Sequence, residues 1–561
     1  MKRGTSFGHL HLMILVICFA ACSKSGGSGN QPPPPLAVPV TLKSIQLNNT
    51  PYTDPVYNVG TTPVLKLQFS QPILHSSVPA SITLTGAGSV ALQTSYESND
   101  SVLIVQPSAA IPYLTKFTFA ISTALKSQAG GSFISNYKND FFTELDSSDK
   151  FPLLSDSALL TLVQQQTFKY FWDFGHPVSG LARERTSSGD VVTSGGSGFG
   201  IMSMLVAVQR NFITRAAALS RIDTIVSFLT NKVTRYHGAF PHWINGATGA
   251  TVPFGQQDNG GDIVETSYMM QGLLCARQFF NSGSDVNEMN LRTAINSLYN
   301  AVEWNWYRQN SQNVLTWNWS PDYNWAINFQ VRGWNEALIT YVLAASSNNV
   351  SNTIPKIVYD NGWAGNGSEK NGQSFYGIKL PLGPDYGGPL FFAHYSFLGI
   401  NPHGLSDAYA NYWEQDTAHA KINYLYCVSN PKKNYGYSSS CWGLTASDIL
   451  GGYTASSPTN DVGVIAPTAA VSSLPYTPIQ SMDAIRFFYY KLGDKVWGQY
   501  GFTDAFSLNS LWFDSDCIAI DQGPEIVMIE NYRSGLLWNL FMSCPEIKTG
   551  MTNLGFTSPN L

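Results

Sequence analysis

The amino-acid sequence predicts a mainly α-helical protein, in which a large helical toroid follows a small all-β sandwich. Short runs of alternating apolar and polar residues occupy the stretch from residue 40 to about residue 146. Beyond residue 155, apolar residues recur instead at steps of three and four, which is the helical period. The length of 561 residues also exceeds the usual size of one domain.

The first 21 residues are typical of a secretory signal peptide. The charged start Met1-Lys2-Arg3 precedes an apolar stretch, residues 10–21, that is too short for a mature membrane anchor. Phe19-Ala20-Ala21-Cys22 resembles a bacterial lipobox, which implies cleavage before Cys22 and lipid attachment at that residue. We therefore expect an exported lipoprotein, in the periplasm or at the outer membrane or cell surface, held to the membrane through its N-terminal lipid only.

Residues 22–39 form the next segment, which is rich in Gly, Ser and Pro and is typical of a solvated tether. From residue 40 to 146, the runs 42–47, 64–69, 101–105 and 116–121 alternate with a period of two and predict strands of a β-sandwich. Segments 67–73 and 129–131 resemble those of bacterial immunoglobulin-like domains, so this domain is expected to act as a spacer.

Residues 150–555 are predicted to form the helical domain. In one clear example, Leu291, Ile295, Leu298 and Val302 recur at steps of four and three. No dinucleotide-binding or P-loop glycine motif follows a strand, which favours an all-α fold. Helical hairpins closed into a toroid would leave one concave end where the long loops converge. A helical solenoid is the alternative, although no fixed repeat period supports it.

The composition favours a neutral ligand. Charged residues make up only 12% of the chain and aromatic residues 13%, with 14 Trp and 28 Tyr, and the formal net charge is −5. Without a long basic run, the chain has no electrostatic footprint for nucleic acid. Many aromatic and amide side chains suit an oligo- or polysaccharide, although Trp and Tyr also fill the cores of large domains.

Cysteine spacing gives no sign of a metal site. Cys18 lies in the signal peptide and Cys22 at the lipidation site, which leaves an odd number of cysteines and therefore at least one free thiol. Cys427 and Cys441 bracket a loop and could form a disulfide or remain two buried thiols. No pair has the CxxC spacing of a zinc site, so we expect no metal and no cofactor.

Three acids surround a glycine break in the segment 258–268. If a helix starts near Asp262, then Asp262 and Glu265 share one face and Asp258 lies over the same helix end. Such a group could hold a sugar between acids. The alternative is a variant of the capping box, in which Asp262 is the N-cap and Glu265 its partner three residues on. The two roles can coexist.

A further acid, Glu336, stands at the start of another apolar helix. Asn335 could be an ordinary N-cap, with Glu336 stabilised by the helix dipole. Indoles close to this carboxyl would instead raise its pKa by desolvation, as a general acid requires. The candidate indoles are those of Trp317, Trp319, Trp325 and Trp334.

Several loops carry candidate substrate-binding residues. Arg183 offers fork donors for hydroxyl groups or for acids, although it could equally be a solvated surface charge. His237 and His242, with Trp243, could bind sugar hydroxyls, although a lone loop histidine is more often structural. Other aromatic and polar clusters add the candidates Trp319, Trp334, Tyr386, His394 and Trp442.

Four segments, 258–268, 332–337, 391–395 and 441–448, together resemble the bacterial glucoamylase-like family, which includes endo-β-1,2-glucanases. The resemblance extends from about residue 155 to residue 545. It implies an (α/α)6 toroid and hydrolysis of β-linked glucans, in members that also occur as lipoproteins with extra β domains. The acidic cluster of the family maps onto Asp258, Asp262 and Glu265, and its candidate acid onto Glu336.

The resulting hypothesis is glycoside hydrolysis by two carboxyl groups, with β-1,2-glucan as the expected substrate and endo action expected. Glu336 would protonate the departing oxygen, while Asp262, Glu265 or Asp258 would activate water. We expect inversion, which predicts carboxyl groups about 6.5–9.5 Å apart, or further if a chain of waters intervenes. The alternative is a non-catalytic surface glycan-binding lipoprotein that uses the same aromatic groove.

Overall fold

A computed structural model describes residues 37–561 in two compact units. The predicted signal peptide, the lipidation site Cys22 and most of the tether lie outside the described residues. The first unit comprises the residues up to Thr53 together with Pro63–Ala109 and Thr118–Asn139, and the second contains Asp54–Thr62, Ala110–Phe117 and Asp140–Leu561. None of the helices in residues 37–561 has the length and apolar composition needed to span a bilayer.

The first unit has the strands that the period-two pattern predicts. Its five-stranded antiparallel sheet has the order β2-β1-β4-β7-β6. These strands are β1 (Leu42–Leu47), β2 (Thr50–Pro51), β4 (Leu65–Phe69), β6 (Leu92–Glu97) and β7 (Val102–Pro107). In β4, Leu65, Leu67 and Phe69 are buried and the residues between them are not, as expected for a strand with one face on the core. A second antiparallel pair consists of β5 (Ile82–Thr85) and β8 (Lys116–Ile121).

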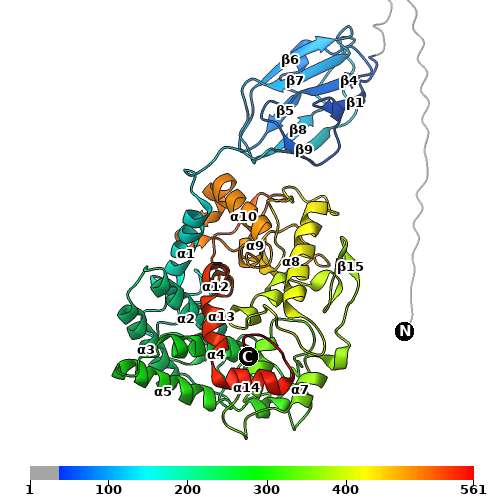
Figure 1. The fold of residues 1–561 in the computed structure, drawn as a ribbon. Coiled ribbons are helices and arrows are strands. Elements are labelled where there is room, and N and C mark those ends of the chain that lie inside the picture. The colour runs from blue at the N-terminus through cyan, green and yellow to red at the C-terminus, as the bar shows by residue number, and fades with distance from the viewer. Residues whose placement is uncertain (1–36) are drawn as a thin grey trace, which may run out of the picture. The chain divides into compact units, whose positions relative to one another are not determined.

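The second unit begins with β3 (Val56–Val59), includes the end of β9 (Tyr137–Thr143), which pairs with β3 in parallel, and continues as the helical domain. One set of helices is buried on nearly every face: α2 (Ser194–Gln209), α4 (Ile263–Phe279), α6 (Leu338–Ala345), α9 (Pro467–Ser472) and α12 (Ala519–Ser534). Helix α2 packs against α4 and α12, and α12 packs against α9 (Figure 1). Helix α4 also packs against α6. These helices form the inner layer of the predicted toroid.

Other helices bury one stripe and expose the opposite face, as an outer layer requires. They are α1 (Asp156–Trp172), α3 (Arg215–Asn231), α5 (Val286–Asn300), α8 (Tyr412–Ser429), α13 (Leu536–Met542) and α14 (Pro545–Leu554). In α5, the predicted stripe Leu291, Ile295 and Leu298 is buried. The helical period of the sequence therefore predicted both the helices and the faces they bury.

Short strands and turns join these helices and frame their ends. The elements near the N-termini of the inner helices are β10 (Val191–Thr193), β11 (Trp243–Asn245), β12 (Thr251–Val252), β13 (Gly261–Asp262), β14 (Asn318–Trp319), β17 (Ala446–Ile449), β18 (Gly452–Ala455), β21 (Phe506–Ser507) and β22 (Trp512–Phe513). The remaining short elements are α7 (Lys356–Asn361), α10 (Pro478–Arg486), α11 (Gly493–Val496), β15 (Ser374–Phe375), β16 (Ile378–Lys379), β19 (Trp497–Gly498) and β20 (Gly501–Phe502).

All five cysteines in the described residues are buried free thiols. Cys427 and Cys441 are therefore two buried thiols rather than a disulfide, which decides between the two alternatives left by the sequence. Burial raises the pKa of the Cys427 thiol to about 12, so it behaves as a small apolar side chain.

Helices α2 and α4 approach each other more closely than side chains would allow. A Cβ added to Gly272 would lie 2.1 Å from the backbone oxygen of Gly198, and one added to Gly198 would lie 2.1 Å from the backbone oxygen of Tyr268. Because both obstacles are backbone atoms, neither can move aside without separating the helices.

We predict that Gly272→Ala destabilises the helical domain by about 2–3 kcal/mol, because overpacking of a filled core costs this much. The unfolding midpoint in urea would measure the loss. Gly283→Ala is the matched control, since a Cβ at Gly283 meets nothing within 4 Å. Equal stability of the two variants would show that the close approach of α2 and α4 is not a constraint.

Candidate active site

A cleft of about 440 Å³ opens where the inner helices begin. Thr193, the residue before α2, Glu265 in the first turn of α4, Glu336 just ahead of α6 and Ile518, the residue before α12, all line it. Aromatic side chains form much of its wall, namely Trp243, Phe254, Tyr268, Trp317, Phe391, Tyr395 and Tyr453. The cleft thus combines apolar walls with a few convergent polar groups, as small-molecule sites do.

Asp262 is the N-cap of α4, as the sequence predicted. Its Oδ1 accepts hydrogen bonds from the backbone N–H groups of Val264 (3.0 Å) and Glu265 (2.8 Å). Its Oδ2 accepts from Trp317 Nε1 and from His242 Nδ1, both at 3.0 Å. With four donors and no exposed surface, this carboxylate is fully engaged inside the protein.

The capping box also predicts a reciprocal hydrogen bond, from the backbone N–H of Asp262 to the Glu265 side chain, and this prediction is wrong. Glu265 does not return to the backbone N–H of Asp262, which donates to the Phe240 carbonyl instead. Its Oε2 accepts from the Gly195 backbone N–H at 2.7 Å and from Thr193 Oγ1 at 3.2 Å. The close contact between α2 and α4 therefore places this carboxyl at the start of α2, where the helix dipole favours negative charge.

Burial raises the pKa of Glu265, and His242 opposes this shift by lowering the pKa while Asp262 adds to it. The two donors from the start of α2 further stabilise the charged form. The Glu265 carboxyl is thus largely desolvated, but specific hydrogen bonds and the charge of His242 stabilise its ionised form.

His242 supplies positive charge among these acids. Burial by itself lowers its pKa, but Glu265, Asp262 and Asp258 together raise the pKa of His242 to about 9. The imidazole is therefore protonated near neutral pH and donates to Asp262. Its ring stacks on Phe254, with the two ring centroids 4.1 Å apart.

Glu336 has the environment expected of a general acid. Burial raises the pKa of this carboxyl to about 7, with added repulsion from Glu265 and Asp262, although its own backbone N–H lowers it. Its backbone carbonyl accepts hydrogen bonds from Ser396 Oγ (2.5 Å) and Tyr268 Oη (3.4 Å). The main chain at this residue is therefore fixed from two sides.

The predicted N-cap role of Asn335 is wrong. Helix α6 begins at Leu338, and its N-cap position is Ala337, which has no capping side chain. Asn335 Oδ1 instead accepts from the Ala337 backbone N–H at 2.9 Å, which closes a local turn before the helix. Glu336 lies in this turn and lines the cleft together with Trp317.

Asp258 lies at the edge of the acidic group and is partly exposed. Burial and the charge of Asp262 raise its pKa, while Asn318 and His242 lower it. Gly260 and Gly261 link it to α4, and a Cβ on Gly260 would lie 2.1 Å from the Trp319 backbone oxygen. The paired glycines therefore allow the loop before α4 to lie against β14.

Of the predicted substrate-binding residues, His242 and Trp243 line the cleft. Arg183 does not; its guanidinium donates to the carbonyls of Phe174 and Gly189, both at 2.8 Å. His237 is also absent from the lining; its Nδ1 pairs with Glu303 at 2.8 Å and its ring stacks on Trp306.

The other five candidates also lie away from the lining of this cleft. Trp319 lies edge-on to the ring of His237, with centroids 5.2 Å apart. Tyr386 packs on the ring of Phe375. Buried partners hold the rest: Trp334 donates to His419 Nδ1, His394 pairs with Ser473 Oγ, and Trp442 donates to the Gln480 carbonyl. Burial lowers the pKa of His394 to about 3.

Glu184 and Arg185, the two residues that directly follow Arg183, line the cleft in its place and were not predicted as substrate-binding residues. Arg185 donates through Nη1 to both oxygens of Asp448 (2.8 and 3.0 Å) and through Nε to Glu184 (2.9 Å). The run Arg-Glu-Arg was visible in the sequence, but its partner Asp448 is 263 residues away.

Two parts of the chain match known protein families. Residues 328–545 match the Glycoamylase family, described as "Putative glucoamylase", and residues 44–143 match the Big_5 family, described as "Bacterial Ig-like domain". The first match covers the turn that holds Glu336, and the second covers the β-sandwich of the N-terminal strands.

Similar proteins act on β-1,2-linked glucans. An exo β-1,2-glucooligosaccharide sophorohydrolase (non-reducing end) of Parabacteroides distasonis is 41% identical over 485 residues, which are 82% of this chain and 66% of that protein. This chain thus spans slightly less than two thirds of that relative's length.

Solved structures extend the likeness. An endo-β-1,2-glucanase from Chitinophaga pinensis, in complex with sophorotriose and glucose, is 51% identical with a TM-score of 0.71, over 73% of this chain and 100% of that one. A β-1,2-glucanase from Parabacteroides distasonis is 36% identical with a TM-score of 0.69, over 92% of this chain and 73% of that one.

The charge on His242 predicts a pH-dependent stability. Since its pKa in the folded protein is raised to about 9, the resulting stabilisation is complete below the pKa of an unfolded histidine and is lost as pH rises through about 9. We expect the wild type to exceed His242→Gln in free energy of unfolding at pH 6, with the difference shrinking by pH 10. Urea unfolding across this range would measure it, and a difference independent of pH would contradict a charged His242.

Proposed function

Because this chain belongs to the bacterial glucoamylase-like family, we propose that it is a glycoside hydrolase that cleaves β-linked glucan, with β-1,2-glucan as its substrate and endo action. The observation that carries the proposal is the cleft itself, which is lined by Glu336, Glu265 and aromatic side chains. Two carboxyl groups in different environments are what glycoside hydrolysis requires. The 51% identical endo-β-1,2-glucanase supports the choice of linkage and of endo action.

Glu336 is the general acid of the proposed reaction. Because its pKa is raised to about 7, a large fraction of the side chain is protonated at neutral pH and can still transfer its proton readily. Protonation of the glycosidic oxygen allows the leaving sugar to depart as an alcohol while positive charge develops on the remaining ring. The proton and the bonding electrons of the cleaved C–O bond both end on the leaving group.

Glu265 is the second carboxyl group in this proposal. Asp262 is occupied by four hydrogen-bond donors, whereas Glu265 lines the cleft and has an oxygen, Oε1, in addition to the Oε2 that binds Gly195 and Thr193. The positive charge of His242 helps to keep Glu265 ionised. Glu265 would accept a proton from the attacking water, which gives inversion at the anomeric carbon.

Asp262 and Asp258 have an indirect part in this scheme. Their charges raise the pKa of His242, which remains protonated beside Glu265. The aromatic wall provides flat apolar faces for sugar rings, and Arg185 and Glu184 add hydrogen-bonding groups to the lining. A neutral glucan would therefore bind by stacking and hydrogen bonds, without a charged anchor.

The proposal includes an exported lipoprotein anchored through Cys22, in the periplasm or at the outer membrane or cell surface. Its support is the sequence of the first 22 residues, with a charged start, an apolar stretch and the segment Phe19-Ala20-Ala21-Cys22. A tethered enzyme of this kind would meet its glucan outside the cytoplasm.

A product assay on a panel of glucans tests the function. We expect new reducing ends from β-1,2-glucan and far fewer from laminarin, cellulose or starch fragments, with a spread of oligosaccharide lengths early in the reaction if action is endo. Release of a single disaccharide from the start would indicate exo action. Binding of β-1,2-glucan without any product would favour the glycan-binding alternative.

Glu336→Gln should lower kcat by about 10²–10⁴, the usual contribution of a general acid, with the substrate still bound. The amide keeps the shape of the side chain but cannot supply the proton. Glu414→Gln, at an exposed glutamate in the first turn of α8, is the matched control and should retain wild-type kcat. Near-normal turnover by Glu336→Gln would remove Glu336 from the mechanism.

The pKa of Glu336 also predicts the basic limb of the pH profile. Only the protonated acid is active, so kcat/KM should fall as pH rises through about 7. Initial rates on β-1,2-glucan between pH 5 and 9 would show this limb, and Glu336→Asp should displace it. A rate that stays constant between pH 6 and 9 would be incompatible with Glu336 as the acid.

A further inference from the structure

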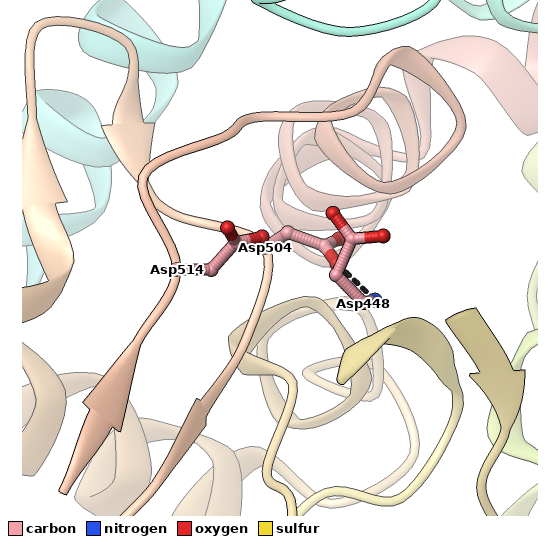
Figure 2. Close-up of side chains that lie close together, drawn as sticks. All are labelled: Asp448, Asp504 and Asp514. Atoms are coloured by element: carbon pink, nitrogen blue, oxygen red, sulfur yellow. Dashed lines mark hydrogen bonds between the residues drawn. The ribbon is translucent and has the colours of Figure 1, made fainter. Parts of the chain in front are cut away.

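Beside the cleft, three aspartates from separate parts of the chain converge (Figure 2). Asp448 lies on β17, while Asp504 and Asp514 flank the hairpin of β21 and β22. One carboxylate oxygen from each lies within 4.8 Å of the corresponding oxygens of the other two. We propose that Asp448, Asp504 and Asp514 bind a calcium ion, a role that does not depend on the proposed glycosidase activity.

Three oxygens within 4.8 Å of one another are compatible with the bond lengths of calcium. Oxygen ligands lie about 2.3–2.6 Å from Ca²⁺, so two ligands on opposite sides of the ion can be about 4.6–5.2 Å apart. Mg²⁺ has shorter bonds, about 2.0–2.1 Å, demands a near-ideal octahedron and usually keeps several waters, so a group made of protein carboxylates favours Ca²⁺. A set made only of carboxylate oxygens is typical of such hard cations rather than of zinc or copper.

Unpartnered oxygens point to a missing ligand. Asp504 is only 2% exposed, and while its Oδ2 accepts from the Asp448 backbone N–H at 2.6 Å, its Oδ1 has no hydrogen-bond partner. Asp514 likewise uses Oδ1 for the backbone N–H groups of Ser515 and Asp516, while no donor reaches its Oδ2 and its carboxyl lies within hydrogen-bonding reach of the Asp448 carboxyl. A buried carboxylate oxygen without a partner is costly, and a cation would satisfy both.

A fourth acid, Asp521, lies next to these three and also has a buried carboxylate oxygen that no donor reaches. Asp521, in the first turn of α12, is 2% exposed, and its Oδ2 also has no hydrogen-bond partner. Its carboxyl lies within hydrogen-bonding reach of the Asp504 carboxyl, so the two acids would repel each other if both were ionised and no cation lay between them. Asp521 is not needed as a ligand, but it adds to the negative potential that would attract a cation.

The nearby cation, Arg185, already forms ion pairs with acidic side chains. Arg185 pairs with Glu184 (2.9 Å) and Asp448 (2.8 Å) and lies 3.8 Å from Asp516. Among residues 37–561, no lysine or arginine forms an ion pair with Asp504, Asp514 or Asp521. One guanidinium therefore serves several acids, and the charge of a divalent ion would offset the remainder.

Such an ion would join the two segments that meet here. Backbone hydrogen bonds from Asp504 to the Asp516 carbonyl and from Asp514 to the Ala505 carbonyl already close the loop that carries two of the ligands. The third ligand, Asp448, lies on the strand that pairs with β18, whose residues Tyr453 and Ala455 line the cleft. Calcium would thus hold one wall of the cleft to the hairpin behind it.

Thermal unfolding of the purified full chain tests the site. After treatment with EDTA and removal of the chelator, millimolar CaCl2 should raise the unfolding midpoint by about 3–6 °C, as saturation of one specific site would. MgCl2 should raise it less. Elemental analysis of protein dialysed against calcium should find about one bound calcium per chain by the same argument.

Asp514→Asn should lose the calcium response, because the amide keeps the backbone hydrogen bonds but removes the ligand charge. Asp494→Asn, at an exposed aspartate that pairs with Lys495, should keep it. If Asp514→Asn does not fold, the wild-type titration and the metal content still decide the matter. No bound calcium and no shift in the wild type, or an equal shift in Asp514→Asn, would overturn the proposal and leave shared protons as the way these acids are neutralised.

Discussion

The cleft depends on the close contact between α2 and α4. Gly198 and Gly272 let the two helix backbones touch, so the start of α2 lies beside the first turn of α4. This contact allows the Gly195 backbone N–H to donate to Glu265. A larger residue at either glycine would separate the helices and leave Glu265 buried without its partner.

The same packing brings several helix N-termini to one end of the domain, where acids are favoured by the helix dipoles. Desolvation then separates the roles of these acids. Asp262 has four donors and is fully engaged, whereas Glu336 has a raised pKa and can hold a proton near pH 7. The protonated His242 balances part of the negative charge. Around Asp448 the acids outnumber the single paired cation, Arg185, and a calcium ion would supply the remaining positive charge.

Local pattern predicted much of the fold and part of the site. Alternation predicted the strands of the sandwich, and helical spacing predicted the buried stripe of α5. The N-cap at Asp262 was predictable because the cap, the helix start and the apolar run are adjacent in sequence. Asn335 did not follow the same rule, since it lies three residues before α6 begins at Leu338 and its side chain closes a local turn.

By itself, the sequence determined the order of the two domains, the helix faces and the N-cap at Asp262, because each depends on near neighbours along the chain. Tertiary structure alone decided that Arg183 binds backbone carbonyls while Arg185 faces the cleft. It also gathered acids far apart in the sequence beside that arginine. Such groupings arise from packing between distant segments, and local periodicity carries no information about them.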